Sequence, residues 1–396
     1  MFGETETLQV KKAILKAIEK KEIAGGNLLI VKGGKEIFYH EDGLASIEEN
    51  RPVKRDTIFR LYSMSKPVTA VAAMILVERG ELDLYESVGK YLEGFRNQMV
   101  DDNGTLVKAE SEVTVKDLLN MTSGLLYGGE NLAGIATSKV FAEIDEKLFT
   151  DNALSTIEIA NKLGNCPLAY HPGSFFSYGT SADVLGAVIE VVSGMPFGEF
   201  LEKEIFRPLG MKDTGFYVPK EKRNRLVCTY GTDGAGGLTL YTDNNLGIIQ
   251  QMDRKPAFES GGAGLVSTID DYAKFTAMLM KGGSYEGVQI LRKRTVEYLT
   301  TKTLNEVQYE GLVSWATLEG HSYGNLMRIM TDTTKAGTIG SPGEYGWDGW
   351  LGCYFTNCPA DDLTILFMIQ KKDAGTMEIT RKLRNIIISS CSEELL

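Results

Sequence analysis

The segment Val68–Val77 is the feature that most constrains the fold. Wound as a helix it is apolar nearly all round, and it follows Pro67 directly and stops before Gly80. Proline is tolerated in the first turn of a helix, and glycine commonly follows the last. The segment is far shorter than the roughly 20 residues needed to cross a bilayer. It therefore predicts a helix buried in a globular core, and no membrane span is expected.

Two polar side chains, Ser63 and Lys66, stand just before this helix. The spacing S-x-x-K puts a hydroxyl and an amine about one turn apart on one helix face. Serine is a weak nucleophile until a nearby base or cation activates it. A structural alternative is that Ser63 caps the helix and Lys66 is a solvated cation. The same spacing at Ser87 and Lys90 has no apolar helix after it and is interpreted as a surface turn.

Composition and charge limit the possible partners. The formal net charge of −11 opposes binding to a phosphate backbone, and no run of Lys and Arg offsets it. No nucleic-acid partner is therefore expected. The three histidines, His40, His171 and His321, are too scattered to predict a metal site, and we expect no metal and no cofactor.

The amino terminus and the cysteines predict a cytoplasmic location. The first residues have neither the basic start nor the apolar core of a signal peptide. The five cysteines are an odd number without a C-x-x-C pair, as suits reduced thiols.

Periodicity divides the chain into β-rich ends and a helical middle. Two β-rich runs around Gly33-Gly34 predict a hairpin, and a capping box of Thr268 and Asp271 is expected to open a helix. Strands are predicted at 352–356 and 363–369. Helices are predicted at 8–21, 68–79, 114–120, 154–163, 182–193, 197–206, 272–280 and 376–389.

The simplest assembly joins the first hairpin and the last strands in one antiparallel sheet. The expected fold class is α+β, with terminal helices flanking the sheet, an inserted mainly helical lobe, and the active site in the cleft between. At 396 residues the chain exceeds the size at which one core usually keeps growing. We predict a sheet lobe of residues 1–62 and 255–396 and a helical lobe of residues 63–254.

Five segments, in family order, resemble the serine β-lactamase and penicillin-binding-protein superfamily. They are most similar to its class C-like branch, and within it to family VIII carboxylesterases. The resemblance spans nearly the whole chain and implies a β-lactamase/transpeptidase-like fold. The segments are Phe59–Pro67, Leu118–Leu125, Pro172–Tyr178, Ser260–Thr268 and Tyr345–Trp350.

Carried over by position, the resemblance implies that Ser63 is the nucleophile and Lys66 its partner. It also implies that Tyr178, the tyrosine of the family's Y-x-N motif, accepts and donates protons. A lysine ammonium about 4 Å from a phenol, at an effective dielectric of about 20, is worth roughly 4 kcal/mol, or about three pK units. We therefore expect Lys66 to lower the pKa of Tyr178 toward neutrality. The structural alternative for Tyr178 is a packed core aromatic.

Trp347-Asp348-Gly349 stands where the family commonly has K-T-G. The resemblance implies an oxyanion hole formed by the backbone N–H groups of Ser63 and Trp350, with Gly349 letting the substrate approach the strand. Trp347 has the alternative of an ordinary packed aromatic. The missing lysine removes a partner for a substrate carboxylate, and Asp348 could repel an anion.

These departures favour an esterase. Thr180 replaces the usual asparagine of Y-x-N, which commonly meets the acylamino group of a β-lactam. The leading hypothesis is a serine hydrolase that forms an acyl-enzyme on Ser63 from a small-molecule ester or amide, most simply a carboxylesterase for small uncharged esters. The alternatives are a β-lactamase or D-amino-acid peptidase, an acyltransferase, and a catalytically silent binding or sensor module of the same fold. The roles of Asp348 and His171, and the oligomeric state, stay open.

Overall fold

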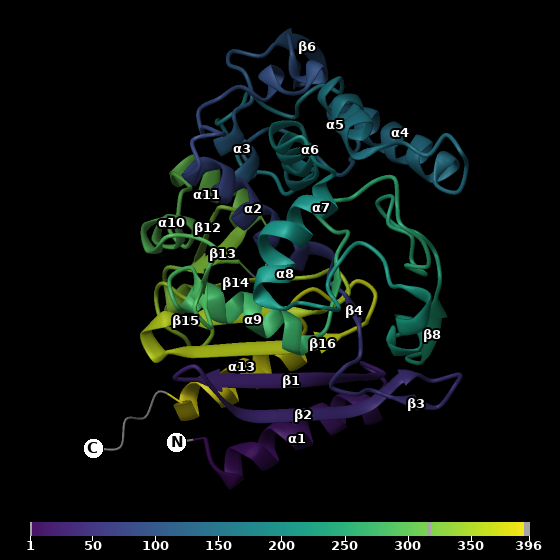
Figure 1. Ribbon diagram of the computed structural model, residues 1–396, viewed down its shortest axis with the longest axis vertical. Coiled ribbons are helices and arrows are strands. Elements are labelled where there is room, and N and C mark those ends of the chain that lie inside the picture. The colour runs from purple at the N-terminus through teal and green to yellow at the C-terminus, as the bar shows by residue number, and fades with distance from the viewer. Residues whose placement is uncertain (1, 315–317, 392–396) are drawn as a thin grey trace.

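A computed structural model describes residues 2–314 and 318–391. An eight-stranded antiparallel sheet runs through one half of the molecule, and Figure 1 shows its strands stacked down the view from β12 to β2. From one edge to the other the strands are β12 (His321–Gly324), β13 (Met327–Met330), β14 (Tyr345–Asp348), β15 (Tyr354–Cys358), β16 (Leu363–Ile369), β1 (Gly25–Lys32), β2 (Lys35–Ser46) and β3 (Arg51–Pro52).

The first hairpin pairs with the last strands, as predicted. β1 lies between β2 and β16, with Gly26 opposite Ile369 and Lys32 opposite Leu363. Gly33 and Gly34 make the turn between β1 and β2 at φ of +60° and +69°, a backbone region that glycine enters without steric cost. Both chain ends therefore belong to the sheet half of the molecule.

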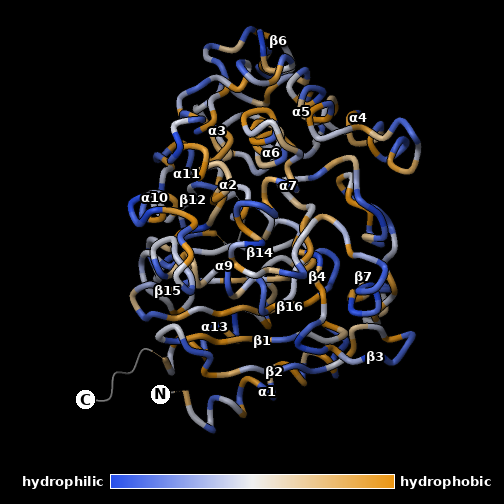
Figure 2. Tube along the Cα trace, viewed as in Figure 1, coloured by the Kyte–Doolittle hydropathy of each residue, from blue (hydrophilic) through white to orange (hydrophobic). Residues whose placement is uncertain are grey.

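The sheet is buried on both faces because each face packs on helices. Along β1, Leu28 and Ile30 face a core closed by the terminal helices α1 (Glu4–Glu19) and α13 (Glu378–Cys391). Leu29 points the other way, into the larger core shared with the helical half. Successive side chains alternate between the faces of a strand, so burial on both faces leaves β16 buried along its whole length and β1 buried from Gly25 to Ile30. Both strands carry the apolar runs that this requires (Figure 2).

Around α2 (Lys66–Glu78) the other half is mainly helical, and α2 is buried from Lys66 to Leu76 as its composition predicts. The predicted helix at 197–206 is interrupted by a π-helical turn at Glu202–Phe206. The remaining helices are α3 (Val115–Asn120), α4 (Leu132–Lys147), α5 (Thr156–Gly164), α6 (Ser181–Ser193), α7 (Phe197–Leu201), α8 (Arg207–Leu209), α9 (Ile269–Met280), α10 (Lys293–Leu299), α11 (Glu306–Val313) and α12 (Thr333–Ala336).

Short two-stranded pairs complete the fold. They are β4 (Phe59–Arg60) with β9 (Val266–Ser267), β5 (Met99–Asp102) with β6 (Thr105–Lys108), β7 (Thr229–Thr232) with β8 (Leu238–Tyr241), and β10 (Ser284–Tyr285) with β11 (Val288–Gln289). The predicted fold class is confirmed, while the lobe boundaries at 62 and 255 stay a prediction.

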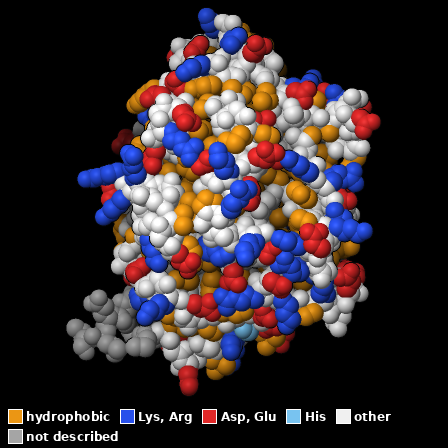
Figure 3. All heavy atoms as spheres, in the orientation of Figure 1, with side chains coloured by type: hydrophobic (Ala, Val, Ile, Leu, Met, Phe, Trp, Pro, Cys, Tyr) orange, Lys and Arg blue, Asp and Glu red, His pale blue; other side chains and the backbone are white. Residues whose placement is uncertain are grey.

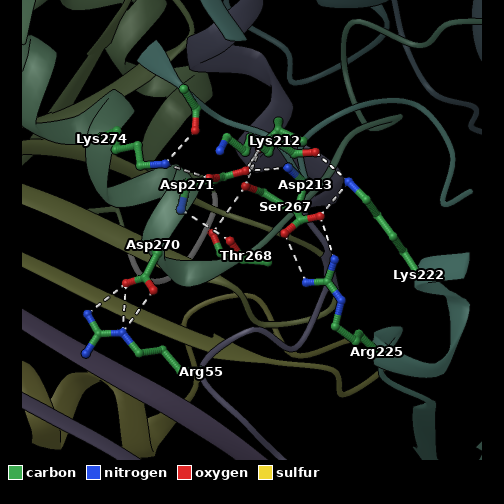
Figure 4. A network of polar contacts seen from close by, with 12 residues as sticks. Arg55, Lys212, Asp213, Lys222, Arg225, Ser267, Thr268, Asp270, Asp271 and Lys274 are labelled. Carbon is green, nitrogen blue, oxygen red and sulfur yellow. Dashed lines mark hydrogen bonds and ion pairs between the residues drawn. The ribbon is translucent and has the colours of Figure 1, made fainter. Parts of the chain in front are cut away.

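A polar network fixes the start of α9 (Figure 4). Thr268 caps the helix by accepting from the N–H of Asp271 at 3.2 Å. The reciprocal half of the predicted capping box is wrong, because the Asp271 carboxylate accepts instead from the N–H of Asp213 at 2.6 Å and from Lys274. β9, directly before this helix, pairs with β4, so the network anchors the segment that leads to Ser63.

Acidic and basic side chains are interspersed on the face drawn in Figure 3. No single helix of the described residues has the length and apolar run needed to cross a membrane; α6 and the stretch Phe197–Leu209 meet that test only as a pair bent by 77°.

Candidate active site

Ser63 sits in a tight turn at the head of α2. The preceding residue, Tyr62, has φ of +45°, which turns the chain sharply into a 3₁₀ turn over Tyr62–Ser65. The turn is tied to the strand beside it by the N–H of Leu61, which donates to the carbonyl of Leu265 at 2.8 Å. The N–H of Leu265 in turn donates to the Ser65 hydroxyl at 3.1 Å. These bonds hold the half-buried Ser63 in place between the two halves of the fold.

Lys66 is fully buried and points its amine at Ser63. Nζ lies 3.1 Å from the Ser63 Oγ, 3.0 Å from the Tyr127 Oη and 2.9 Å from the carbonyl oxygen of Gly262. Burial lowers the pKa of Lys66 to about 7, although the negative charge of Asp183 opposes the shift.

A neutral lysine amine suits these three partners. It has two N–H donors and one lone pair, and the Gly262 carbonyl can only accept. With a second N–H directed to Tyr127, the lone pair remains for the hydroxyl proton of Ser63. The S-x-x-K spacing therefore places a buried amine at the serine rather than a solvated surface cation.

Tyr178 completes the group predicted from the sequence. Its hydroxyl is hydrogen-bonded to the Ser63 side chain and accepts from the Trp347 Nε1 at 3.0 Å. The Lys66 Nζ lies 4.6 Å from the centre of the Tyr178 ring. The predicted lowering of the Tyr178 pKa is wrong: burial raises it, since the phenolate would lose more solvation than its neighbours return.

Tyr127 and Asp183 belong to the site but were not singled out in the sequence. Tyr127 contacts the Lys66 amine, and burial keeps its pKa well above the ordinary value. Asp183, on α6, accepts from the hydroxyl of Ser260 and from the N–H of Gly262 at 3.0 Å. It thereby fixes the loop whose carbonyl receives Lys66. No short-range pattern marks either residue, because both reach Lys66 through tertiary packing.

The two backbone N–H groups expected to form the oxyanion hole make no hydrogen bond within the described part of the chain. Among the described residues, neither the backbone N–H of Ser63 nor that of Trp350 donates a hydrogen bond to the protein. The end of β14 runs directly against the turn before Ser63, because a Cβ on Gly349 would overlap the carbonyl oxygen of Leu61. The Trp350 side chain is fixed by a different contact, because its Nε1 donates to the Asp373 carboxylate at 2.7 Å.

The side chains of Trp347 and Asp348 leave β14 on opposite faces, as those of successive strand residues do. Trp347 is buried against Tyr178 and Tyr323, with ring centres 5.5 Å and 5.1 Å away. Asp348 accepts from the hydroxyl of Thr376, and burial raises its pKa. Trp347 is thus both a packed aromatic and a hydrogen-bond donor to the site.

One cavity of about 580 Å³ opens at Ser63. Tyr178, Trp347 and Trp350 line it near the serine, and it extends past Asp348 to side chains of β13, β15 and α13. Among the described residues, no three His, Cys, Asp or Glu side chains gather as metal ligands.

The other predicted features lie apart from this cavity. The Ser87 hydroxyl accepts from the N–H of Gly89 at 3.1 Å, and Lys90 pairs with Glu86 at the surface, so this second S-x-x-K is the turn that its sequence predicted. His171 accepts from the N–H of Glu110 at 3.2 Å. Thr180 is buried at the start of α6, with no partner for its hydroxyl among the described residues.

Comparisons with known proteins cover nearly the whole chain. Residues 10–387 match the family described as Beta-lactamase. Protein Rv1367c of Mycobacterium tuberculosis is 31% identical over 360 residues, which is 88% of this chain and 86% of that protein. Esterase EstB of Burkholderia gladioli is 28% identical over 347 residues, 85% of this chain and 83% of EstB.

Solved structures match the fold over almost every residue. The structure of EstCE1, described as a hydrolase with promiscuous acyltransferase activity, has a TM-score of 0.82 at 24% identity and covers 97% of this chain and 99% of that one. Simvastatin synthase (LovD) from Aspergillus terreus has a TM-score of 0.79 at 21% identity, with 98% and 99% covered. At these identities the structural likeness concerns the fold alone.

Proposed function

Because the chain belongs to the β-lactamase family and is a serine hydrolase, we propose that it is a carboxylesterase that forms an acyl-enzyme on Ser63. The observation that carries the proposal is the contact of the Lys66 amine with the Ser63 hydroxyl at 3.1 Å, beside two backbone donors that have no partner among the described residues. A nucleophile, its base and an oxyanion hole are the parts that acyl transfer needs.

Acylation begins with neutral Lys66. Its lone pair takes the Ser63 proton while Oγ attacks the ester carbonyl carbon, and the N–H groups of Ser63 and Trp350 stabilise the oxyanion. Each such donor is worth roughly 3 kcal/mol in the transition state. The ring of Tyr178, 4.6 Å from Nζ, favours the ammonium that forms.

Tyr178 then serves as the acid. Its raised pKa keeps the hydroxyl protonated, so it can give a proton to the departing alkoxide as the ester C–O bond breaks. Lys66 returns its proton to Tyr178, and the amine is neutral again. In deacylation water takes the place of the alcohol, and the same transfers run in reverse to release the acid.

The W-D-G segment favours esters over β-lactams. Without the lysine of K-T-G, strand β14 offers an indole beside the serine, and Thr180 offers no amide to an acylamino group. EstB, an esterase by name, is among the relatives. An acyltransferase shares the first half-reaction and differs only in which nucleophile accepts the acyl group.

Intact-mass analysis after exposure to a fluorophosphonate tests the nucleophile. The wild type should gain one adduct, Ser63→Ala should gain none, and Ser87→Ala, from the second S-x-x-K, should be labelled like the wild type. Unlabelled wild-type protein would favour a silent module, and labelling of Ser63→Ala would disprove the assignment.

Substrate class is tested by comparing p-nitrophenyl butyrate with nitrocefin on the same protein. We expect the ester to be hydrolysed with the higher kcat/KM. A preference for nitrocefin would assign a β-lactamase, and faster turnover of the butyrate on adding an alcohol, with a new ester as product, would assign an acyltransferase.

A further inference from the structure

Arg328 is a buried cation in the cavity that holds Ser63, and its guanidinium has no hydrogen-bond or ion-pair partner among the described residues. It lies on β13, 6% exposed, and lines the cavity together with Ser63 and Trp347. Its Nη2 is buried and has no hydrogen-bond partner. Within residues 2–314 and 318–391, no hydrogen bond or ion pair involves the Arg328 guanidinium.

Two carboxylates that line the same cavity, Glu344 and Asp348, are committed to other groups. Glu344 accepts from Arg384 at 2.6 Å and 2.8 Å, and that pair is almost fully buried. Asp348 accepts from the hydroxyl of Thr376. Its negative charge reaches Arg328 only through space, because no ion pair within 4.0 Å joins them.

The other neighbours of Arg328 in the described part of the chain supply no negative charge. Gly346, its cross-strand neighbour on β14, has no side chain, and the Tyr354 ring centre lies 5.1 Å from its Cζ. His321, on β12, stays neutral, since burial and then the charge of Arg328 lower its pKa to about 3. The cation–π contact with Tyr354 leaves the guanidinium N–H donors unsatisfied.

An unpaired buried charge destabilises a fold unless a ligand of opposite charge binds to it. Leaving a charged donor buried without a partner costs more than leaving a neutral donor in the same state. The planar guanidinium fork matches a carboxylate in a bidentate geometry. The cavity gives that carboxylate room and connects it to the serine.

We propose that Arg328 binds a carboxylate of the substrate, so that the preferred ester carries a negative charge away from the scissile bond. The inference rests on the proposed esterase function and names its substrate class. It revises the expectation of uncharged esters, which considered only the lysine missing from β14. The cation comes instead from the neighbouring strand, β13. Asp348 repels an anion less than its sequence position implied, because its carboxylate is hydrogen-bonded to Thr376 and burial raises its pKa.

Two substrate pairs test the preference and locate the charge. Monoethyl adipate against ethyl hexanoate places the carboxylate on the acyl side, and 4-acetoxybutyrate against butyl acetate places it on the alcohol side. The wild type should hydrolyse the charged member of one pair with the higher kcat/KM, and the pair that shows the preference identifies the side.

Arg328→Met should lower the charged-to-neutral ratio of kcat/KM by about ten- to a hundredfold, as expected for a lost charged hydrogen bond. Arg328→Lys keeps the charge but loses the planar guanidinium, so its charged-to-neutral ratio of kcat/KM should lie between those of the wild type and Arg328→Met. Arg294→Met is the matched control, because that side chain is 95% exposed, and it should leave the ratio unchanged. A wild type without preference, or an Arg328→Met protein that loses both substrates equally, overturns the proposal.

Binding without turnover separates this inference from the esterase proposal. In a Ser63→Ala background, adipate should raise the Tm, and it should not do so when Arg328→Met is added. If the esters are not hydrolysed but this shift is seen, the anion site stands and the esterase assignment fails. If adipate does not raise the Tm, or raises it equally in the Arg328→Met protein, the proposal that Arg328 binds an anion is wrong.

Discussion

The indole Nε1 of Trp347 donates to the phenol oxygen of Tyr178 at 3.0 Å, which joins strand β14 to the side chain we propose as the acid. The bond is made to the hydroxyl oxygen, so it does not use the phenol proton. In the proposed mechanism, the tryptophan that stands where the family commonly has lysine orients a proton donor instead of binding an anion.

Trp347→Phe should keep the ring packing and lose this bond. We expect kcat for p-nitrophenyl butyrate to fall about three- to tenfold, in line with the roughly 1 kcal/mol of one hydrogen bond. Trp350→Phe removes an indole that donates to Asp373 and should have a smaller effect. Equal losses in the two variants would mean that the Tyr178 contact has no special role.

Hydrolysis should depend on the protonation of Lys66, whose pKa burial lowers to about 7. The neutral amine is the reactive form, so kcat/KM should rise about tenfold per pH unit below 7 and level off above it. Measuring p-nitrophenyl butyrate hydrolysis from pH 5 to 9 tests this, with fluorophosphonate labelling as a check that acylation follows the same curve. A rate that falls as the pH rises through 7 would rule out Lys66 as the base.

Tyr127→Phe should move that midpoint to lower pH. The Tyr127 hydroxyl, 3.0 Å from the Lys66 Nζ, accepts from the ammonium and so favours the charged form. Losing about 1 kcal/mol of that stabilisation would lower the pKa of Lys66 by roughly 0.7. Tyr170→Phe, which removes a hydroxyl bonded to the Met121 carbonyl outside the cavity, is the control. A midpoint that moves upward, or moves equally in both variants, contradicts this role.

Local patterns predicted the elements that carry Ser63 and Lys66, whereas the role of Ser63 as the nucleophile came from the family resemblance and stays a prediction. The apolar run after Ser63, the S-x-x-K spacing and the glycine pair at residues 33–34 each act within a few residues, so they could be recognised without the fold. The segments that place Tyr178 and Trp347 needed the family resemblance, because they lie far from Ser63 in the chain.

What the sequence could not supply depends on tertiary burial. The pKa of Tyr178 was predicted in the wrong direction because a Coulomb estimate with Lys66 omits the desolvation of both groups. Tyr127 and Arg328 were missed for a related reason. Arg328 lies in a four-residue strand that no periodicity marks, and its lack of a partner becomes visible only once its neighbours are placed.

Gly349→Ala tests whether the end of β14 must lie against the turn that carries Ser63. A Cβ there would overlap the Leu61 carbonyl oxygen, which is backbone and cannot rotate away. The strand would have to move and carry the Trp350 N–H with it, so we expect kcat/KM to fall by about a hundredfold or more, the value of one oxyanion donor, together with a lower Tm. Gly215→Ala is the matched control, since nothing lies within 4 Å of its added Cβ, and it should leave both quantities nearly unchanged. Full activity in Gly349→Ala would show that the Trp350 N–H is not a donor to the transition state, whereas a lower Tm with unchanged kcat/KM would confine this glycine to packing.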